Sequence, residues 1–182
     1  MRRMDAPGQV ERVWIRRLRW RMRGAWQWPA FAVLTVIDAI LLTRLPFYDA
    51  DVEAAGTPEP VSELRTAVRA ADLLVLVTPE YNGSVPGLLA NAIDWLSRPH
   101  RDAALRGTSV LVLSASPRPS GGARAAAQLR AVLTGIGASV LPTGLSVGAA
   151  HSRLSDEIDR QLVADLTGLL TDALEPAARG AA

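Results

Sequence analysis

The sequence predicts an α/β protein in which helices cover both faces of a parallel sheet. Two continuous apolar runs, at residues 73–77 and 109–113, have the character of strands buried on both faces. Segments with helical spacing of apolar residues lie between and around them. Strands that alternate with helices of about ten to fifteen residues predict βαβ units. Right-handed crossovers arrange such units as a doubly wound, three-layer αβα sandwich.

The expected elements follow one another along the whole chain. Apolar runs mark the strands, and Pro at a helix start or Gly after a helix end bounds most of the helices. In chain order the sequence predicts a strand within 33–42, a loop at 45–57, a helix at 60–71, a strand at 73–77, a helix at 86–97, a strand at 109–113, a helix at 123–134, a short strand at 140–141 and a long helix at 155–174.

Particular residues justify the helix bounds. Pro58 and Pro60 open the helix that precedes the first buried strand, and Pro86 opens the helix that follows it. Ser155 is the expected N-cap of the long last helix. Residues 176–182 are expected to form a loose tail, because chain ends without anchoring contacts are poorly ordered.

Length and composition favour a single domain that spans residues 1–182. The hydrophobic fraction of 49% fits a globular protein rather than a disordered one. The chain has no cysteine, which excludes disulfides, thiolate nucleophiles and cysteine metal sites and fits a cytoplasmic protein. All 20 basic residues are Arg and the net charge is only +2, so the basic character is weak evidence for nucleic-acid binding.

Residues 1–31 differ from the rest of the chain, because Arg and Trp crowd this segment. A basic arm with interleaved tryptophans can bind nucleic acid by charge and stacking, but a poorly packed arm is the favoured interpretation. A basic flank before the apolar run 30–42 also resembles a signal anchor. That run is shorter than the ~20 residues of a membrane span, so a buried helix or strand is favoured. We therefore expect neither a nucleic-acid nor a membrane partner.

A turn rich in Pro, Gly and Asn follows the strand at 73–77 and points to a specific chemistry. In an open α/β sheet, ligands bind beyond the carboxyl ends of the strands. Residues 79–84 are expected to donate backbone N–H groups to the rim of a planar ring, with Gly83 allowing close approach. The loop 114–122 follows the next buried strand and is expected to form a second wall of the same crevice. The alternatives are a plain strand-to-helix turn and a mobile linker.

The residues around this turn carry a family resemblance. The run 76–87 (LVTPEYNGSVPG), continued by 91–99 (NAIDWLSRP), resembles the NADPH-dependent FMN reductases, a family of flavodoxin-like fold with a five-stranded parallel sheet. The resemblance covers about residues 36–145 and implies FMN as cofactor and NADPH or NADH as electron donor. The residues that it implies for the flavin site are Pro79, Glu80, Tyr81, Asn82, Gly83, Ser84, Ser114, Ser116, Gly121 and Gly122.

The resemblance implies an FMN-dependent NAD(P)H oxidoreductase. A nicotinamide would deliver hydride to the flavin, which would pass electrons to a small-molecule acceptor such as a quinone, an azo dye or a metal oxyanion. Because the flavin does the chemistry, no catalytic acid–base side chain is expected, and Glu80 is expected to order its loop or a neighbouring subunit. Family members are usually homodimers or homotetramers, with the Tyr48 loop and the helix from Pro86 as candidate contacts. The alternative is a flavodoxin-like binding module with impaired or lost FMN binding.

The front of the chain departs from the family pattern. The family opens with a strand and a loop of the form Gly-Ser-x-Arg-x-x-Ser-x-Asn, whose hydroxyls and amides hold the FMN phosphate at a helix N-terminus. By length this loop should fall near residues 14–24, which read WIRRLRWRMRG. The resemblance then implies residues 10–15 as the first strand and 26–37 as a shortened first helix. Three explanations stay open: the arginines hold the phosphate by charge, the segment has lost FMN affinity, or residues 1–30 come from a misread coding frame, which is slightly favoured.

Overall fold

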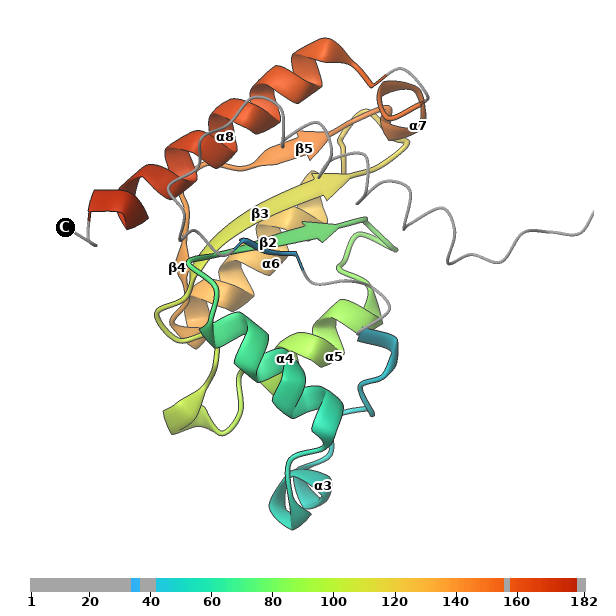
Figure 1. Cartoon of the computed structure of the whole chain (residues 1–182). Helices are drawn as coiled ribbons and strands as arrows, with labels where there is room; N and C mark the ends of the chain where they lie inside the picture. The colour runs from blue at the N-terminus through green and yellow to red at the C-terminus, as the bar shows by residue number, and fades with distance from the viewer. Residues whose placement is uncertain (1–33, 37–41, 156–157, 180–182) are drawn as a thin grey trace, which may run out of the picture. The chain divides into compact units, whose positions relative to one another are not determined.

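The computed structural model describes residues 34–36, 42–155 and 158–179, all within one compact unit, Ala32–Ala182. The strand expected at 10–15, the helix at 26–37 and the whole segment 1–31 lie outside or largely outside these residues. The described elements are β1 Leu34–Val36, α3 Ala50–Ala55, α4 Glu59–Arg69, β2 Leu73–Thr78, α5 Gly87–Leu96, a 3-10 turn η1 His100–Asp102, β3 Ser109–Ala115, α6 Ala123–Ile136, β4 Ser139–Val140, β5 Leu145–Val147, α7 Ala150–Arg153 and α8 Arg160–Arg179 (Figure 1).

The described strands form one parallel sheet in the order β1-β2-β3-β4, with β5 also paired to β3. β4 and β5 pair with the two ends of β3, since Val110 is opposite Val140 and Leu113 is opposite Leu145. The predicted short strand at 140–141 is therefore β4, one residue earlier. β5 was not predicted, because three residues with one alternation give little strand pattern.

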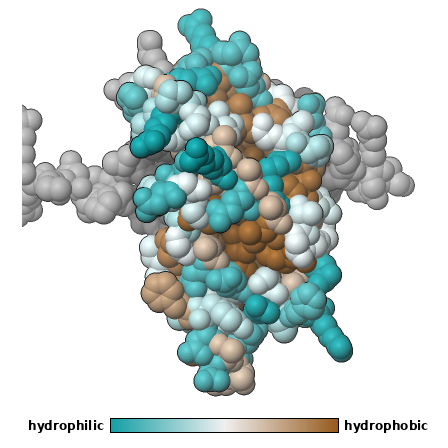
Figure 2. Space-filling view, turned by 180° about the vertical axis from the view of Figure 1, so that it is seen from behind, coloured by the Kyte–Doolittle hydropathy of each residue, from teal (hydrophilic) through white to brown (hydrophobic). Residues whose placement is uncertain are grey.

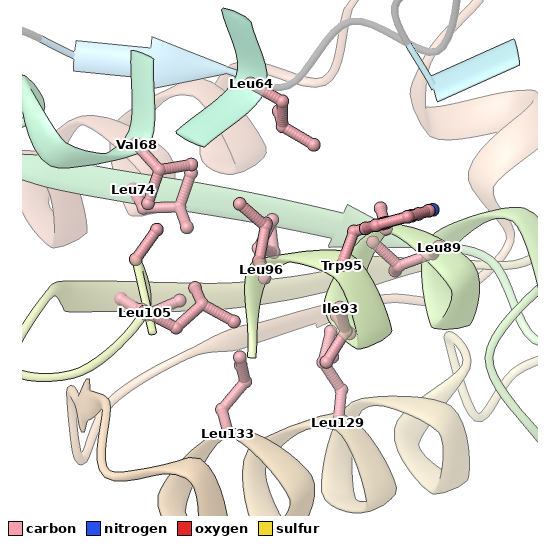
Figure 3. Close-up of a cluster of buried hydrophobic side chains, with 14 of the residues drawn as sticks. Leu64, Val68, Leu74, Leu89, Ile93, Trp95, Leu96, Leu105, Leu129 and Leu133 are labelled. Carbon is pink, nitrogen blue, oxygen red and sulfur yellow. The ribbon is translucent and has the colours of Figure 1, made fainter. Parts of the chain in front are cut away.

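Helices cover both faces of this sheet, which confirms the predicted α/β class and the doubly wound arrangement (Figure 1). One face packs against α4, α5 and α6 through alternate residues of β2 and β3. The other face packs against α8, where Leu162 meets Val147 of β5. Figure 3 shows the larger core cluster, which lies between the sheet and α4, α5 and α6. Its labelled side chains are Leu64, Val68, Leu74, Leu89, Ile93, Trp95, Leu96, Leu105, Leu129 and Leu133.

Two predicted boundaries are wrong, and capping residues explain both. The expected loop at 45–57 contains α3, because the Asp49 carboxylate accepts the N–H of Asp51 and starts a helix in the Ala-rich run that follows. The last helix begins at Arg160 rather than at 155, because Asp159 accepts the N–H groups of Gln161 (2.8 Å) and Leu162 (3.3 Å). This helix continues to Arg179, five residues beyond its expected end.

Among the residues that the structure describes, no helix combines the length and the apolar character that a bilayer crossing requires. The apolar run 30–42, which raised the question of an anchor, lies mostly outside the described ranges.

Candidate functional site

A tight turn follows β2 at the carboxyl edge of the sheet. Tyr81 donates its N–H to the carbonyl of Ser84 at 2.9 Å, and Ser84 returns a hydrogen bond to the carbonyl of Tyr81 at 3.0 Å. Between them Asn82 and Gly83 have φ angles of 53° and 79°, the two positive values of a type I′ turn. Asn-Gly is the residue pair that most readily adopts this turn, so the local sequence accounts for its shape.

The turn presents the groups that a flat polar-rimmed ligand requires. The Tyr81 side chain is 62% exposed, and no described residue accepts a hydrogen bond from the N–H of Asn82 or Gly83. A methyl group built on Gly83 would meet nothing within 4 Å, so the backbone there is open to close approach. Val77 is 53% exposed, although the other residues of β2 are buried. Amide donors and apolar surface therefore lie together at the end of this strand.

The second predicted wall, the loop 114–122, is packed against the end of β5. Ser116 donates its N–H to the carbonyl of Val147 at 3.0 Å, and its hydroxyl accepts the N–H of Arg118 at 3.2 Å. Gly121 has a φ of 62°, and a Cβ there would lie 2.7 Å from the carbonyl carbon of Ser146. Only glycine fits this contact, so the loop is a built wall rather than a free linker.

The two loops meet, as the sequence predicted. The Glu80 carboxylate accepts the backbone N–H of Arg124, in the first turn of α6, at 3.2 Å. A Cβ on Gly122 would lie 3.6 Å from the Cβ of Glu80 and 3.3 Å from the Cβ of Ser114. Glu80 is thus engaged with the loop that faces it, which agrees with the expectation that it orders the turn.

The predicted site residues differ in their access to a ligand. Ser114 is fully buried and its hydroxyl donates to the hydroxyl of Ser146 at 2.9 Å, so its side chain is closed to a ligand. Ser116 is 8% exposed, and its hydroxyl closes the turn at Arg118. The residues with side chains or backbone open to solvent are Pro79, Tyr81, Asn82 and Gly83. Ser84 is half-buried and its hydroxyl donates to Gln128 of α6.

The loop that contains Pro46 and Tyr48 is anchored by residues to which the sequence analysis gave no role. The Asn91 side chain accepts the N–H of Tyr48 at 2.8 Å and donates to the carbonyl of Pro46 at 2.9 Å. The indole of Trp95 donates to the same carbonyl at 2.8 Å. Both residues belong to the run 91–99 that carried the resemblance, but no pattern in the sequence gave them a role. Between these anchors Phe47 is 85% exposed.

Tyr48 is fixed on all sides. Its hydroxyl donates to Glu53 at 3.0 Å, and its ring centroid lies 5.0 Å from that of Trp95 in an edge-to-face arrangement. The guanidinium of Arg98 lies 5.7 Å from the centroid of the Tyr48 ring. The hydrogen bond to Glu53, with desolvation and the negative charge of the same carboxylate, raises the pKa of the Tyr48 phenol. The hydroxyl is therefore a stable donor at neutral pH.

Comparison with known families decides the assignment. The model of the NADPH-dependent FMN reductase family matches residues 30–152. The chain belongs to this family. Membership confirms the expected fold class and makes the chain an oxidoreductase whose cofactors are FMN and a nicotinamide dinucleotide.

Relatives in this FMN reductase family extend along most of the chain. The quinone reductase of Escherichia coli K12 is 42% identical over 136 residues, which cover 71% of this chain and 72% of the relative. The NAD(P)H-dependent FMN reductase PA1204 of Pseudomonas aeruginosa is 36% identical over 134 residues, 70% of this chain and 72% of the relative. The structure of FerB, a flavoenzyme NAD(P)H:(acceptor) oxidoreductase from Paracoccus denitrificans, has a TM-score of 0.70 at 25% identity, covering 96% of this chain and 91% of FerB.

The atypical front of the chain lies apart from this match. The family model begins at residue 30, after most of the Arg- and Trp-rich segment. The phosphate loop expected near residues 14–24 lies outside the described residues. The described residues therefore include the turn and the loop for which the resemblance implies contact with the flavin ring, and not the segment expected to hold the phosphate.

Proposed function

We propose that the chain is an FMN-dependent NAD(P)H:quinone oxidoreductase. The observation that carries the proposal is the Tyr81 turn, which places free amide donors and apolar surface at the carboxyl edge of β2. The similarity to quinone reductases supports a quinone as the acceptor. Azo dyes and metal oxyanions are further acceptors to be tested.

Each described part of the site has a separate role in this proposal. FMN, when bound, supplies the centre that takes up and releases electrons. The N–H groups of Asn82 and Gly83 donate to the polar rim of the ring, and Val77 and the Tyr81 side chain offer apolar contact. The loop 116–122 bounds the opposite side of the crevice. These contacts use the residues that the structure leaves accessible.

A flavin titration tests this proposal. The purified chain should bind added FMN, show the flavin absorption bands and oxidise NADPH or NADH with a benzoquinone as acceptor. Tyr81→Ala should weaken FMN binding roughly tenfold, because an aromatic contact contributes about 0.5–1.5 kcal/mol. His100→Ala, an exposed residue in η1, is the matched control and should bind FMN as the unsubstituted chain does. A chain that binds no FMN at saturation would favour the binding-module alternative.

We further propose that the protein is a homodimer or a homotetramer. The support is Phe47, an 85% exposed aromatic side chain in a loop that Asn91 and Trp95 hold in place. Figure 2 also shows apolar residues gathered in the middle of the face seen from behind, on the side of α6. Exposed apolar patches of this kind often mark subunit contacts. A cytoplasmic location, without nucleic-acid or membrane partners, stays a prediction from the sequence.

A further inference from the structure

The first two turns of α6 hold both ends of the Tyr81 turn. On the amino side, the Glu80 carboxylate accepts the N–H of Arg124 at 3.2 Å. On the carboxyl side, the side-chain oxygen of Gln128 accepts from the Ser84 hydroxyl at 2.9 Å and from the N–H of Val85 at 3.3 Å. The first contact is made by a backbone N–H at the amino end of the helix, and the second by a side chain four residues later, about one helical turn along.

The turn depends on these anchors for its direction. Within the turn, two hydrogen bonds between Tyr81 and Ser84 close a loop of two residues. Such a short hairpin is marginally stable in water when nothing else supports it. The contacts of Glu80 and Gln128 supply that support from outside the turn. They therefore fix where the free N–H groups of Asn82 and Gly83 point.

We propose that Glu80 and Gln128 are positioning residues that hold the Tyr81 turn in register with the FMN ring. The proposal rests on the proposed function, since the ring is the ligand that the turn would meet. Donors that are fixed before binding lose little freedom when the ligand arrives, so the two anchors increase FMN affinity without touching FMN. We call Glu80 and Gln128, with their contacts between the turn and α6, the α6 clamp.

The chemistry of each anchor fits this role. The Glu80 carboxylate lies at the amino end of a 14-residue helix, where unpaired N–H groups and the helix dipole favour a negative charge. Gln128 uses only its carbonyl oxygen toward the turn. A glutamate at position 128 would keep an acceptor oxygen at the same place. Gln128→Glu is accordingly a rescue variant, and Gln128→Ala is the variant that opens the clamp.

The loss of Gln128 should loosen the turn without unfolding the domain. Gln128 is exposed and Ser84 is half-buried, so water can replace the lost acceptor. We expect the thermal midpoint of the flavin-free Gln128→Ala protein to stay near that of the unsubstituted chain. Amide hydrogen exchange at residues 81–85 of the same protein should become faster, which reports the clamp independently of FMN.

The decisive experiment compares FMN dissociation constants, measured by flavin fluorescence on titration with the flavin-free protein. Gln128→Ala should raise the constant roughly tenfold, Gln128→Glu should restore it, and Glu80→Gln should give an intermediate value. Gln161→Ala is the matched control, because Gln161 is an exposed glutamine of α8 with a single side-chain bond to Asp165. It should bind FMN like the unsubstituted chain.

The outcomes separate this proposal from the proposed function. If the unsubstituted chain binds FMN and Gln128→Ala binds it equally well, the clamp has no positioning role and the proposal is overturned. The same conclusion follows if affinity falls only in step with a loss of thermal stability, or if Gln128→Glu fails to restore it. A chain that binds no FMN at all removes the proposed function, and the clamp proposal with it, even where exchange at 81–85 responds to Gln128→Ala.

Discussion

Arg65 carries a full charge inside the domain. It is 8% exposed, and its guanidinium donates to the carbonyl of Trp95 at 3.1 Å and to the hydroxyl of Thr57 at 3.2 Å. It also forms an ion pair with Glu53 at 3.3 Å. One side chain of α4 thus ties the segment around α3 to the end of α5. A buried guanidinium of this kind stabilises the fold only while all its partners are present.

Replacing Arg65 should therefore be costly. Arg65→Met removes the guanidinium from the Trp95 carbonyl and leaves the half-buried Glu53 without its cationic partner, and we expect a loss of about 3 kcal/mol in the free energy of unfolding. Arg44→Ala removes an exposed ion pair with Glu63 and should cost less than about 1 kcal/mol. Urea unfolding of the two variants measures the difference. Equal losses would show that Arg65 contributes no more than a surface charge.

Two arginines beside the site lead to a prediction about the electron donor. Arg118 and Arg124 flank the amino end of α6, and no described residue accepts a hydrogen bond from either guanidinium or pairs with it. Free guanidinium groups favour a phosphate, and the 2′-phosphate is the group that NADPH carries and NADH lacks. The double variant Arg118→Ala, Arg124→Ala should raise KM for NADPH roughly tenfold, equivalent to about 1.4 kcal/mol, and leave KM for NADH unchanged.

Steady-state kinetics with both donors check this prediction, which rests on the proposed function. Arg101→Ala is the control, because this exposed residue lies in η1 before the amino end of β3. Its KM values should not change. A parallel rise for NADPH and NADH in the double variant would mean that the two arginines do not distinguish the donors.

At the scale of elements, two glycines should respond in opposite ways to alanine. Gly121, before α6, has a φ of 62°, and a Cβ there would lie 2.7 Å from the backbone of Ser146. Gly121→Ala should lower the free energy of unfolding by more than about 2 kcal/mol. Gly168 lies inside α8, and a Cβ built there would meet nothing within 4 Å. Gly168→Ala should therefore raise the free energy of unfolding by about 0.5–1 kcal/mol. Denaturant unfolding that gives both variants the same sign would contradict this contrast.

The cap of α8 should make stability depend on pH in acid. Asp159 pairs with Arg153 at 2.8 Å, and this bond, with the N–H of Leu162 and of Gln161, lowers the pKa of its carboxyl. The folded pKa then lies below the unfolded value of about 4, so the stabilisation is complete above that pH and is lost as the pH falls through the folded pKa. Thermal unfolding should show a lower midpoint for Asp159→Asn at neutral pH and a closing gap in acid. A gap that is independent of pH would exclude the carboxylate as its source.

Pattern strength explains which elements the sequence predicts. β2 and β3 are continuous apolar runs, and α4, α5 and α6 have Pro or Gly at their ends, so their bounds are predicted to within two residues. The start of α8 is predicted at Ser155, but the structure uses Asp159, a second good cap four residues later. The ion pair between Asp159 and Arg153 distinguishes them, and that contact exists only in the folded chain.

At the scale of the whole molecule, the sequence likewise predicts one part of the candidate site and misses another. The Tyr81 turn and its neighbouring wall are predicted because each follows a buried strand, and parallel strands bring such loops to one edge. Glu80 is expected to order its loop, but the partners of the anchoring residues are not predicted. Glu80 meets Arg124 across 44 positions, and Trp95 meets Pro46 across 49. Contacts over such distances depend on the packed fold and leave no periodic pattern in the sequence.

Assembly of several chains is tested at Phe47. Phe47→Ser should weaken association about thirtyfold, because a central aromatic contact typically contributes about 2 kcal/mol. Phe47→Tyr keeps the ring and should assemble like the unsubstituted chain. Light scattering across a dilution series measures both. Identical association of Phe47→Ser and the unsubstituted chain would place the subunit contact elsewhere.

The divided strand beside β3 limits how such an assembly can be built. Leu141 still donates its N–H to the carbonyl of Val110, but residues 142–144 between β4 and β5 leave the ladder. Arg130 of α6 donates to the carbonyls of Leu141, Pro142 and Thr143. Pro142 also lacks an N–H. An incoming strand would find acceptors already occupied and a donor missing, so the sheet cannot be extended continuously along this edge. Copies of the chain must therefore join through helices and loops on this side, and the same interruption opposes fibril growth by edge-to-edge strand addition.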